Sequence, residues 1–277
     1  MIVIDKQTPG RHGNKVLHFN TLMQMANILK QSPLTDNWDC YDMFAQTCPV
    51  IKTPMTTVEI SHEDLIYENR ESLVSKYSQG HWRLHSLSLC GPFFRISETD
   101  PRDFIKLNNK PQLPDNGNTN VGIHIRGGDN RGADGMNCRE VHSPDYYKKS
   151  IDYVLEHYEG KVNFFLCTDD PDPNYPSYWD TLCHLRRLGV GLYHDPSRHY
   201  MVDFAILSEC DILISGSSTF VMAAAIIGKK KKIIHSKDFV SQFNKEDQKW
   251  YSGFGNGMFF YDLNHKKSPF YDLWRLI

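Results

Sequence analysis

Short apolar runs alternate with helix-like segments through the second half of the chain, and this alternation constrains the fold more than any other feature. The runs expected to form strands are 121–125, 162–168, 191–193, 211–215 and 232–235. Apolar residues at helical spacing predict helices over 144–158, 178–188, 200–209 and 219–227, the first of them capped by Ser143. Strands that alternate with helices are typical of an α/β protein with a parallel, doubly wound sheet.

The first strand of this region ends abruptly in charged residues and glycines. Residues 121–129 read Val-Gly-Ile-His-Ile-Arg-Gly-Gly-Asp. Ligands of open α/β sheets bind beyond the carboxyl ends of the strands, and His124 and Arg126 share one face because they are two residues apart. A guanidinium suits a phosphate, which it binds through paired hydrogen bonds. The alternative is that Arg126 forms an ordinary surface ion pair with Asp129 and that His124 is a core histidine.

A second predicted strand, 211–215, is followed by a glycine and three hydroxyl residues. Hydroxyls and N–H groups at a helix amino terminus form an uncharged cradle for phosphate oxygens, which makes Ser217, Ser218 and Thr219 candidates. Helix capping by one of them is the alternative. Upstream, the carboxylate of Asp203 lies within an apolar segment. It could accept hydrogen bonds from the N1–H and amino group of a guanine, or it could be a helix N-cap.

Two glycine-bearing loops are further candidates. The amino-terminal region predicts a strand over 1–5, a loop ending in Gly13 and Asn14, and a helix whose apolar pattern covers 16–29. Such a loop can aim N–H groups at a phosphate, although it matches neither the Walker A nor the dinucleotide fingerprint. The second loop follows Arg126 and carries three carboxylates over 129–140. It could suspend an acid over a reacting centre, but most acids in loops serve solubility.

A polar, turn-rich stretch over 108–120 predicts a domain boundary. We expect an amino-terminal α/β domain over 1–112, joined by the tail 240–277, and a Rossmann-like domain over 113–239. The formal net charge is −2, so nothing indicates a nucleic-acid or anionic-membrane surface.

Seven scattered cysteines without CxxC pairs predict free thiols and no zinc site. Neither a signal peptide nor an apolar run long enough to span a bilayer is found in the sequence. Together these features predict a cytoplasmic protein without a membrane anchor in this chain.

These stretches together resemble the superfamily of α1,2-, α1,6- and protein O-fucosyltransferases. Its hallmark is a His-x-Arg motif at a strand end, here His124 and Arg126. The loop over 10–14 is similar to the family's glycine-asparagine loop, and the segment 203–220 to its carboxyl-terminal motif. The resemblance covers most of 121–236 and a short amino-terminal piece.

The resemblance implies a GT-B fold, in which two Rossmann-like halves face each other across a cleft. The first domain would be on the acceptor side, and the second would bind the nucleotide sugar. The enzyme would be inverting and metal-independent, and it would use GDP-fucose and no cofactor. The other partner would be an oligosaccharide or glycan acceptor. Roles follow for the matching residues. Arg126 would bind the β-phosphate, His124 and Asp203 the guanine, Ser217, Ser218 and Thr219 the diphosphate, Gly13 and Asn14 the donor from the opposite wall, and Asp134 would be the general base.

One position departs from the family pattern. Many members have a second arginine where this chain has Gly127, and the loss of that charge leaves two alternatives open. The donor could be another nucleotide sugar such as a UDP-sugar, or the chain could be a catalytically degenerate nucleotide- or glycan-binding protein. For Asp169 and Asp170, which look like a metal-binding pair, a structural or loop-capping role is expected.

Overall fold

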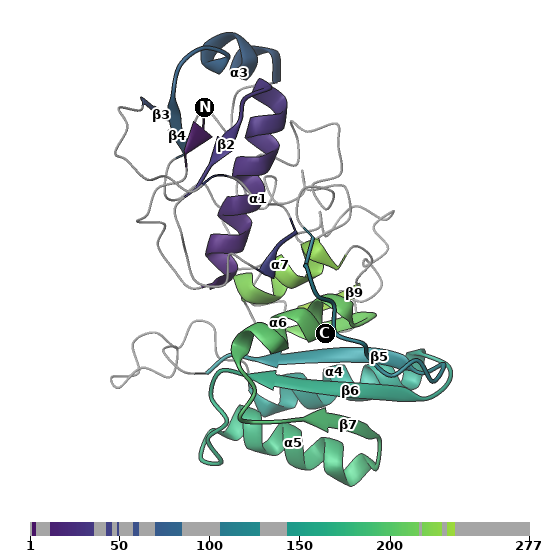
Figure 1. The fold of residues 1–277 in the computed structure, drawn as a ribbon. Helices are drawn as coiled ribbons and strands as arrows, with labels where there is room; N and C mark the ends of the chain where they lie inside the picture. The colour runs from purple at the N-terminus through teal and green to yellow at the C-terminus, as the bar shows by residue number, and fades with distance from the viewer. Residues whose placement is uncertain are drawn as a thin grey trace. The chain divides into compact units, whose positions relative to one another are not determined.

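The computed structural model describes residues 2–3, 12–35, 43–45, 49, 58–60, 70–84, 106–127, 143–215, 218–228 and 232–235. The chain divides into two compact units, Met1–Asn109 and Lys110–Ile277. Each unit contains a parallel sheet and helices (Figure 1). The predicted α/β class with parallel sheets is therefore confirmed. No helix in the described part of the chain is long and apolar enough to cross a membrane.

The first unit has a four-stranded parallel sheet in the order β2-β1-β4-β3. Its elements are β1 (Ile2–Val3), α1 (His12–Leu29), β2 (Pro33–Leu34), β3 (Val58–Ile60), α3 (Arg70–Tyr77) and β4 (Trp82–Leu84). Helix α1 packs on α3 and on the first two strands. At its end, Gln31 Nε2 donates to the carbonyls of Tyr77 and Ser78, which ties α1 to the end of α3.

Helix α1 begins four residues before the predicted apolar pattern. His12 and His18 are buried together with the apolar residues of the helix. A pattern of apolar residues does not register buried histidines, which is why the sequence placed the start at residue 16. Gly13 and Asn14 consequently lie in the first turn of α1 rather than in a loop that precedes it.

The second unit follows the predicted order of elements. These are β5 (Thr119–Ile125), α4 (Pro144–His157), β6 (Val162–Thr168), α5 (Pro176–Leu188), β7 (Gly191–His194), α6 (Tyr200–Glu209), β8 (Ile212–Ser215), α7 (Thr219–Ile227) and β9 (Lys232–His235). Ser143 caps α4 as predicted, its side chain accepting from the N–H of Tyr146. All five strands are parallel, in the order β7-β6-β5-β8-β9.

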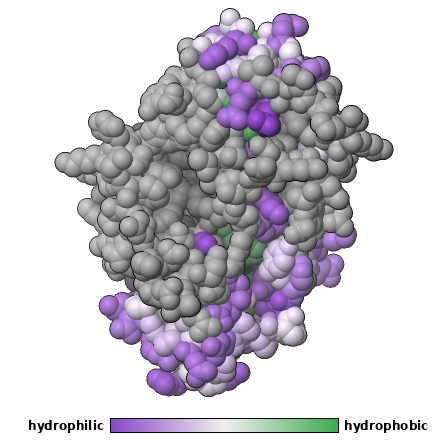
Figure 2. All heavy atoms as spheres, turned by 90° about the vertical axis from the view of Figure 1, so that its left-hand side faces the viewer, coloured by the Kyte–Doolittle hydropathy of each residue, from purple (hydrophilic) through white to green (hydrophobic). Residues whose placement is uncertain are grey.

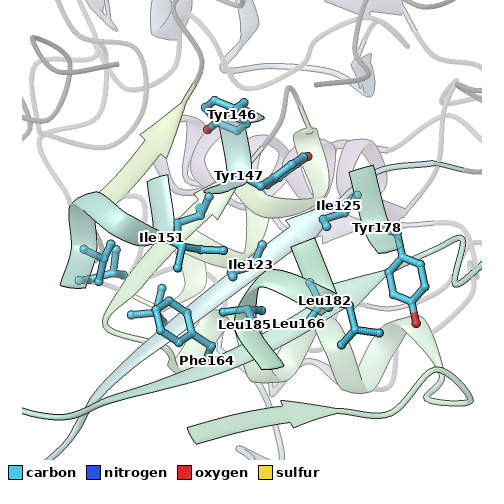
Figure 3. Packing of buried hydrophobic residues seen from close by; sticks show 14 of the residues in the cluster. Ile123, Ile125, Tyr146, Tyr147, Ile151, Phe164, Leu166, Tyr178, Leu182 and Leu185 are labelled. Atoms are coloured by element: carbon cyan, nitrogen blue, oxygen red, sulfur yellow. The ribbon is translucent and has the colours of Figure 1, made fainter. Parts of the chain in front are cut away.

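Two helix layers cover this sheet. Helices α4 and α5 pack together on one face, and α6 and α7 pack together on the other (Figure 1). Alternate residues of β5 separate the layers: Ile123 and Ile125 belong to the core under α4 and α5 (Figure 3), whereas Gly122 faces Leu207 of α6. His124 has the parity of Gly122, so its ring lies on the α6–α7 face.

Described residues exposed on the side that faces the carboxyl ends of β5 and β6 are mostly hydrophilic (Figure 2). The apolar side chains of the second unit are mainly internal.

Candidate functional site

The strand order of the second unit reverses between β5 and β8. From β5 the chain first adds β6 and β7 on one side, and then returns to add β8 and β9 on the other. Open parallel sheets bind ligands outside the carboxyl ends of the strands at such a switch point. At the ends of these two strands lie the predicted His124–Arg126 motif and the hydroxyl-rich segment before α7. The topology therefore brings the two strongest sequence candidates to one edge.

His124 is buried beside an aromatic pair. It is 6% exposed, and its ring centroid lies 5.1 Å from that of Phe220 in α7. Phe220 in turn meets Phe204 of α6 edge to face at 5.2 Å. This burial agrees with the core-histidine alternative. It also places an imidazole and an aromatic ring together at the end of β5, where a flat base could contact them.

The backbone of Arg126 and Gly127, just after β5, is held by two side-chain hydrogen bonds. The Tyr175 hydroxyl donates to the Arg126 carbonyl at 2.7 Å, and Asp169 Oδ1 accepts from the Gly127 N–H at 2.7 Å. The bond to Asp169 agrees with the structural role expected for this carboxylate. The Arg126 side chain is half-buried.

Gly127 touches the second acid of the pair. A Cβ added to Gly127 would lie 2.6 Å from the Cβ of Asp170 and 2.8 Å from its Oδ2. Any side chain at this position, including the second arginine of the fucosyltransferase pattern, therefore requires Asp170 to move. The glycine and the aspartate occupy this strand end as a matched pair.

Ser218 caps α7, which is the alternative that the sequence left open for the hydroxyl cluster. Its side chain accepts from the Phe220 N–H at 3.3 Å, and the residue is 3% exposed. A hydroxyl that accepts at a cap retains its own O–H for donation. The preceding strand is held by a bond from the Tyr146 hydroxyl to the Ser215 carbonyl, 2.8 Å long.

Asp203 is buried in the first turn of α6 and paired with Arg198. The Arg198 Nε donates to Asp203 Oδ1 at 2.7 Å, and the two side chains are 15% and 7% exposed. His199 caps this helix, so the N-cap alternative for Asp203 is wrong. Burial raises the pKa of Asp203 to about 6, against the opposing effects of the Arg198 cation and a hydrogen bond with the Cys167 thiol.

Strand pairing connects these residues across the sheet. His124 of β5 is in register with Cys167 of β6 on one side and with Ser215 of β8 on the other. Cys167 reaches Asp203 beneath α6. Three separate stretches of sequence are thus brought to the same edge.

Sequence reasoning missed Arg198 and Cys167. A signal for Arg198 existed, because a carboxylate within the apolar run 201–207 needs a cation when buried, and Arg198 is five residues upstream. Cys167 carried no such signal.

The remaining candidates stay predictions. Gly13 is buried in α1 of the first unit, and Asn14 belongs to the same turn, but its side chain is outside the described residues. Asp134 and Ser217 are outside them too, as is the side chain of Thr219. Within the described ranges, no group of three or more His, Cys, Asp or Glu could hold a metal ion. Cys167, Cys183 and Cys210 are free thiols, as predicted.

The sequence matches no protein-family model and no curated protein. Solved structures do resemble the chain. The apo form of POFUT1 is similar with a TM-score of 0.54 and 11% identity, over 84% of this chain and 97% of that one. POFUT1 in complex with GDP-fucose gives 0.53 and 12%, over 85% and 97%. Fucosyltransferase NodZ from Bradyrhizobium gives 0.51 and 16%, over 84% and 94%.

The chain therefore shares its fold with these fucosyltransferases, and the resemblance stated from its motifs is confirmed at the level of the fold. Since the identities are between 11% and 16%, the likeness carries the architecture and leaves donor, acceptor and activity open.

Proposed function

We propose that this protein is an inverting, metal-independent glycosyltransferase that moves fucose from GDP-fucose to a hydroxyl of a glycan. The observation that carries the proposal is the meeting of the His124–Arg126 motif and the Ser218 turn at the switch point of a fold shared with fucosyltransferases. The solved structure of POFUT1 with GDP-fucose supports the choice of donor.

In the proposed reaction, a base removes the proton of the acceptor hydroxyl while that oxygen attacks the anomeric carbon. The bond from this carbon to the diphosphate breaks on the opposite face, so the configuration inverts. Arg126 stabilises the negative charge that develops on the departing GDP, and Asp134 is proposed as the base. The hydroxyls of Ser217, Ser218 and Thr219 donate to diphosphate oxygens. Gly13 and Asn14 are proposed to contact the donor from the first domain.

The remaining residues of the proposed site concern the nucleobase of the donor. His124 and Asp203 are proposed to hold guanine, because a carboxylate matches the paired N–H donors of its N1 and 2-amino groups. Uracil presents no such pair. Phe220, which packs against His124, would supply an aromatic surface beside the base.

A second candidate function is nucleotide or glycan binding without transfer. The specific observation in its favour is the contact between Gly127 and Asp170, which leaves no room for a second arginine at position 127. This candidate predicts nucleotide binding in the absence of sugar transfer.

The test is a thermal-shift comparison of GDP, UDP, GDP-fucose and UDP-sugars, each without metal and with EDTA, because a ligand of the native state raises its apparent stability. The proposal expects selective stabilisation by GDP and GDP-fucose that EDTA does not remove, followed by transfer of fucose to a glycan acceptor. Stabilisation by UDP alone would overturn the donor. Binding of GDP-fucose without transfer to any glycan would favour the second candidate.

A further inference from the structure

Arg198 is anchored at both ends of its guanidinium. Its Nε donates to Asp203 Oδ1 at 2.7 Å, and its Nη2 donates to the carbonyl of Leu166 in β6 at 3.1 Å. The residue lies in the short connection between β7 and α6. A planar fork fixed at two points has little freedom left. The guanidinium therefore fixes the orientation of the Asp203 carboxylate.

The Leu166 carbonyl is itself held by a second donor. His194, its register partner in β7, approaches the same oxygen through Nδ1 at 3.1 Å. Its Nε2 lies 2.9 Å from the hydroxyl of Tyr178. A carbonyl only accepts, so Nδ1 carries the hydrogen and Nε2 accepts from Tyr178. Burial, the largest cause, and the Arg198 cation both lower the pKa of His194, which keeps its ring neutral in this arrangement.

The ion pair is not explained by stability alone. Buried pairs recover little more than their desolvation cost, and an apolar replacement is often as stable. Here the pKa of Asp203 stays raised in spite of Arg198, so its ionisation costs folding free energy. A carboxylate has about four lone-pair sites. Arg198 and the Cys167 thiol each donate to it once, which leaves capacity for a ligand.

We propose that Arg198 is a positioning residue for recognition of the nucleotide base: it orients the ionised Asp203 carboxylate toward the N1–H and 2-amino group of guanine. The inference rests on the proposed function, in which the donor carries guanine. Arg198 makes no contact with the base. It acts through Asp203, by its charge and by the direction of its hydrogen bond, and the bond to the Leu166 carbonyl fixes the orientation of its guanidinium.

Charge and direction can be separated by two substitutions. Arg198→Gln removes the cation, and Arg198→Lys keeps it but loses the two-point fork. Arg187→Gln, at an exposed arginine in the last turn of α5, is the matched control. Dissociation constants are measured by calorimetry for GDP and for IDP, which lacks the 2-amino group, between pH 5.5 and 9.

The wild type is expected to prefer GDP over IDP by about tenfold or more, because a site that pairs with the amino group rejects an analogue without it. This preference should fade as the pH drops through about 6, where Asp203 takes up a proton. Three groups act on that carboxylate. Arg198 and Cys167 lower its pKa, and Asp195 raises it.

Arg198→Gln should raise the pH at which the preference is lost by about 1 to 3 units, since the opposing cation is gone. Arg198→Lys should reduce the preference, because the two-point fork is lost, while the remaining preference fades at the same pH as in the wild type, because the cation is kept. Arg187→Gln should change neither. A wild type that binds GDP selectively, with an unmoved midpoint and preference in Arg198→Gln, would overturn this inference alone. A wild type that binds no guanine nucleotide would overturn the proposed function together with it.

Discussion

Replacing Asp203 with Asn is expected to stabilise the fold at neutral pH while it removes guanine recognition. Burial raises the pKa of Asp203 from 3.8 to about 6. A shift of about two pKa units corresponds to about 3 kcal/mol of unfolding free energy. Asn is the neutral isostere of the protonated acid, and its carbonyl can still accept from Arg198. The variant should therefore escape that cost without losing the hydrogen bond.

The direction of the pH dependence follows from the raised value. Below pH 3.8 Asp203 is protonated in both the folded and the unfolded chain, so wild type and variant should be equally stable in this respect. Between pH 3.8 and about 6 the unfolded chain loses its proton while the folded wild type keeps it, so the stability of the wild type falls behind that of the variant. Above pH 6 both states are ionised and the difference stays constant. Urea denaturation of both proteins should show a difference of about 3 kcal/mol at pH 8 and roughly half of it at pH 5.

A matched control is Asp180→Asn, at an exposed carboxylate 3.4 Å from Lys148. This pair is exposed to solvent, so its loss should change stability by less than about 1 kcal/mol. The reasoning would be refuted if Asp203→Asn were less stable than the wild type at pH 8, or if the difference failed to shrink toward pH 5. The first result would make Asp203 a net stabilising partner of Arg198, with no need of a ligand to explain it. The second would mean that ionisation of Asp203 is not the source of the cost.

Three further predictions concern the strand end and the segment of sequence that follows it. Arg126→Ala should abolish transfer and weaken GDP binding, and unchanged calorimetry and activity would exclude its phosphate role. Asp134→Asn should lose transfer and keep donor binding, whereas full activity would remove Asp134 as the base. Gly127→Ala should cost about 1 to 3 kcal/mol in urea denaturation, because its Cβ would lie 2.6 Å from that of Asp170. Asp170→Gly should recover part of this loss in a double-mutant cycle, because Tyr175 Cε1, 2.9 Å from the added Cβ, remains. Additive effects would contradict the contact with Asp170.

The second unit could be predicted from the sequence almost element by element, because its signals are local. The buried parallel strands β5, β6 and β8 give largely apolar runs, and the helices between the strands give a helical period and a cap at Ser143. The first unit could be predicted only at its start, where the expected strand over 1–5 and the helix over 16–29 correspond to β1 and α1. Its strands β1 to β4 are two or three residues long, which is too short for any period to show, and α1 begins on the buried His12.

The candidate site was predictable where it depends on strand ends and not where it depends on tertiary partners. His124 and Arg126 follow a strand that any reading of the sequence finds. The pairing of Asp203 with Arg198 depends on the path of the loop between β7 and α6, and the contact with Cys167 depends on the register of β6. Residue spacing predicts neither of these two contacts. A carboxylate in an apolar run indicates only that a buried Asp203 needs some partner.

The contact between Gly127 and Asp170 also bears on how much Asp203 contributes to donor binding. Because Gly127 lies against Asp170, the second arginine of the fucosyltransferase pattern could not occupy position 127 unless Asp170 moved. Less of the binding energy then comes from phosphate charge, and more must come from the base. A buried carboxylate that is held ionised by Arg198 at a cost to stability is the kind of group that can supply it. It follows that GDP should bind this protein with a weak dependence on salt, because the decisive pairing is buried and poorly screened.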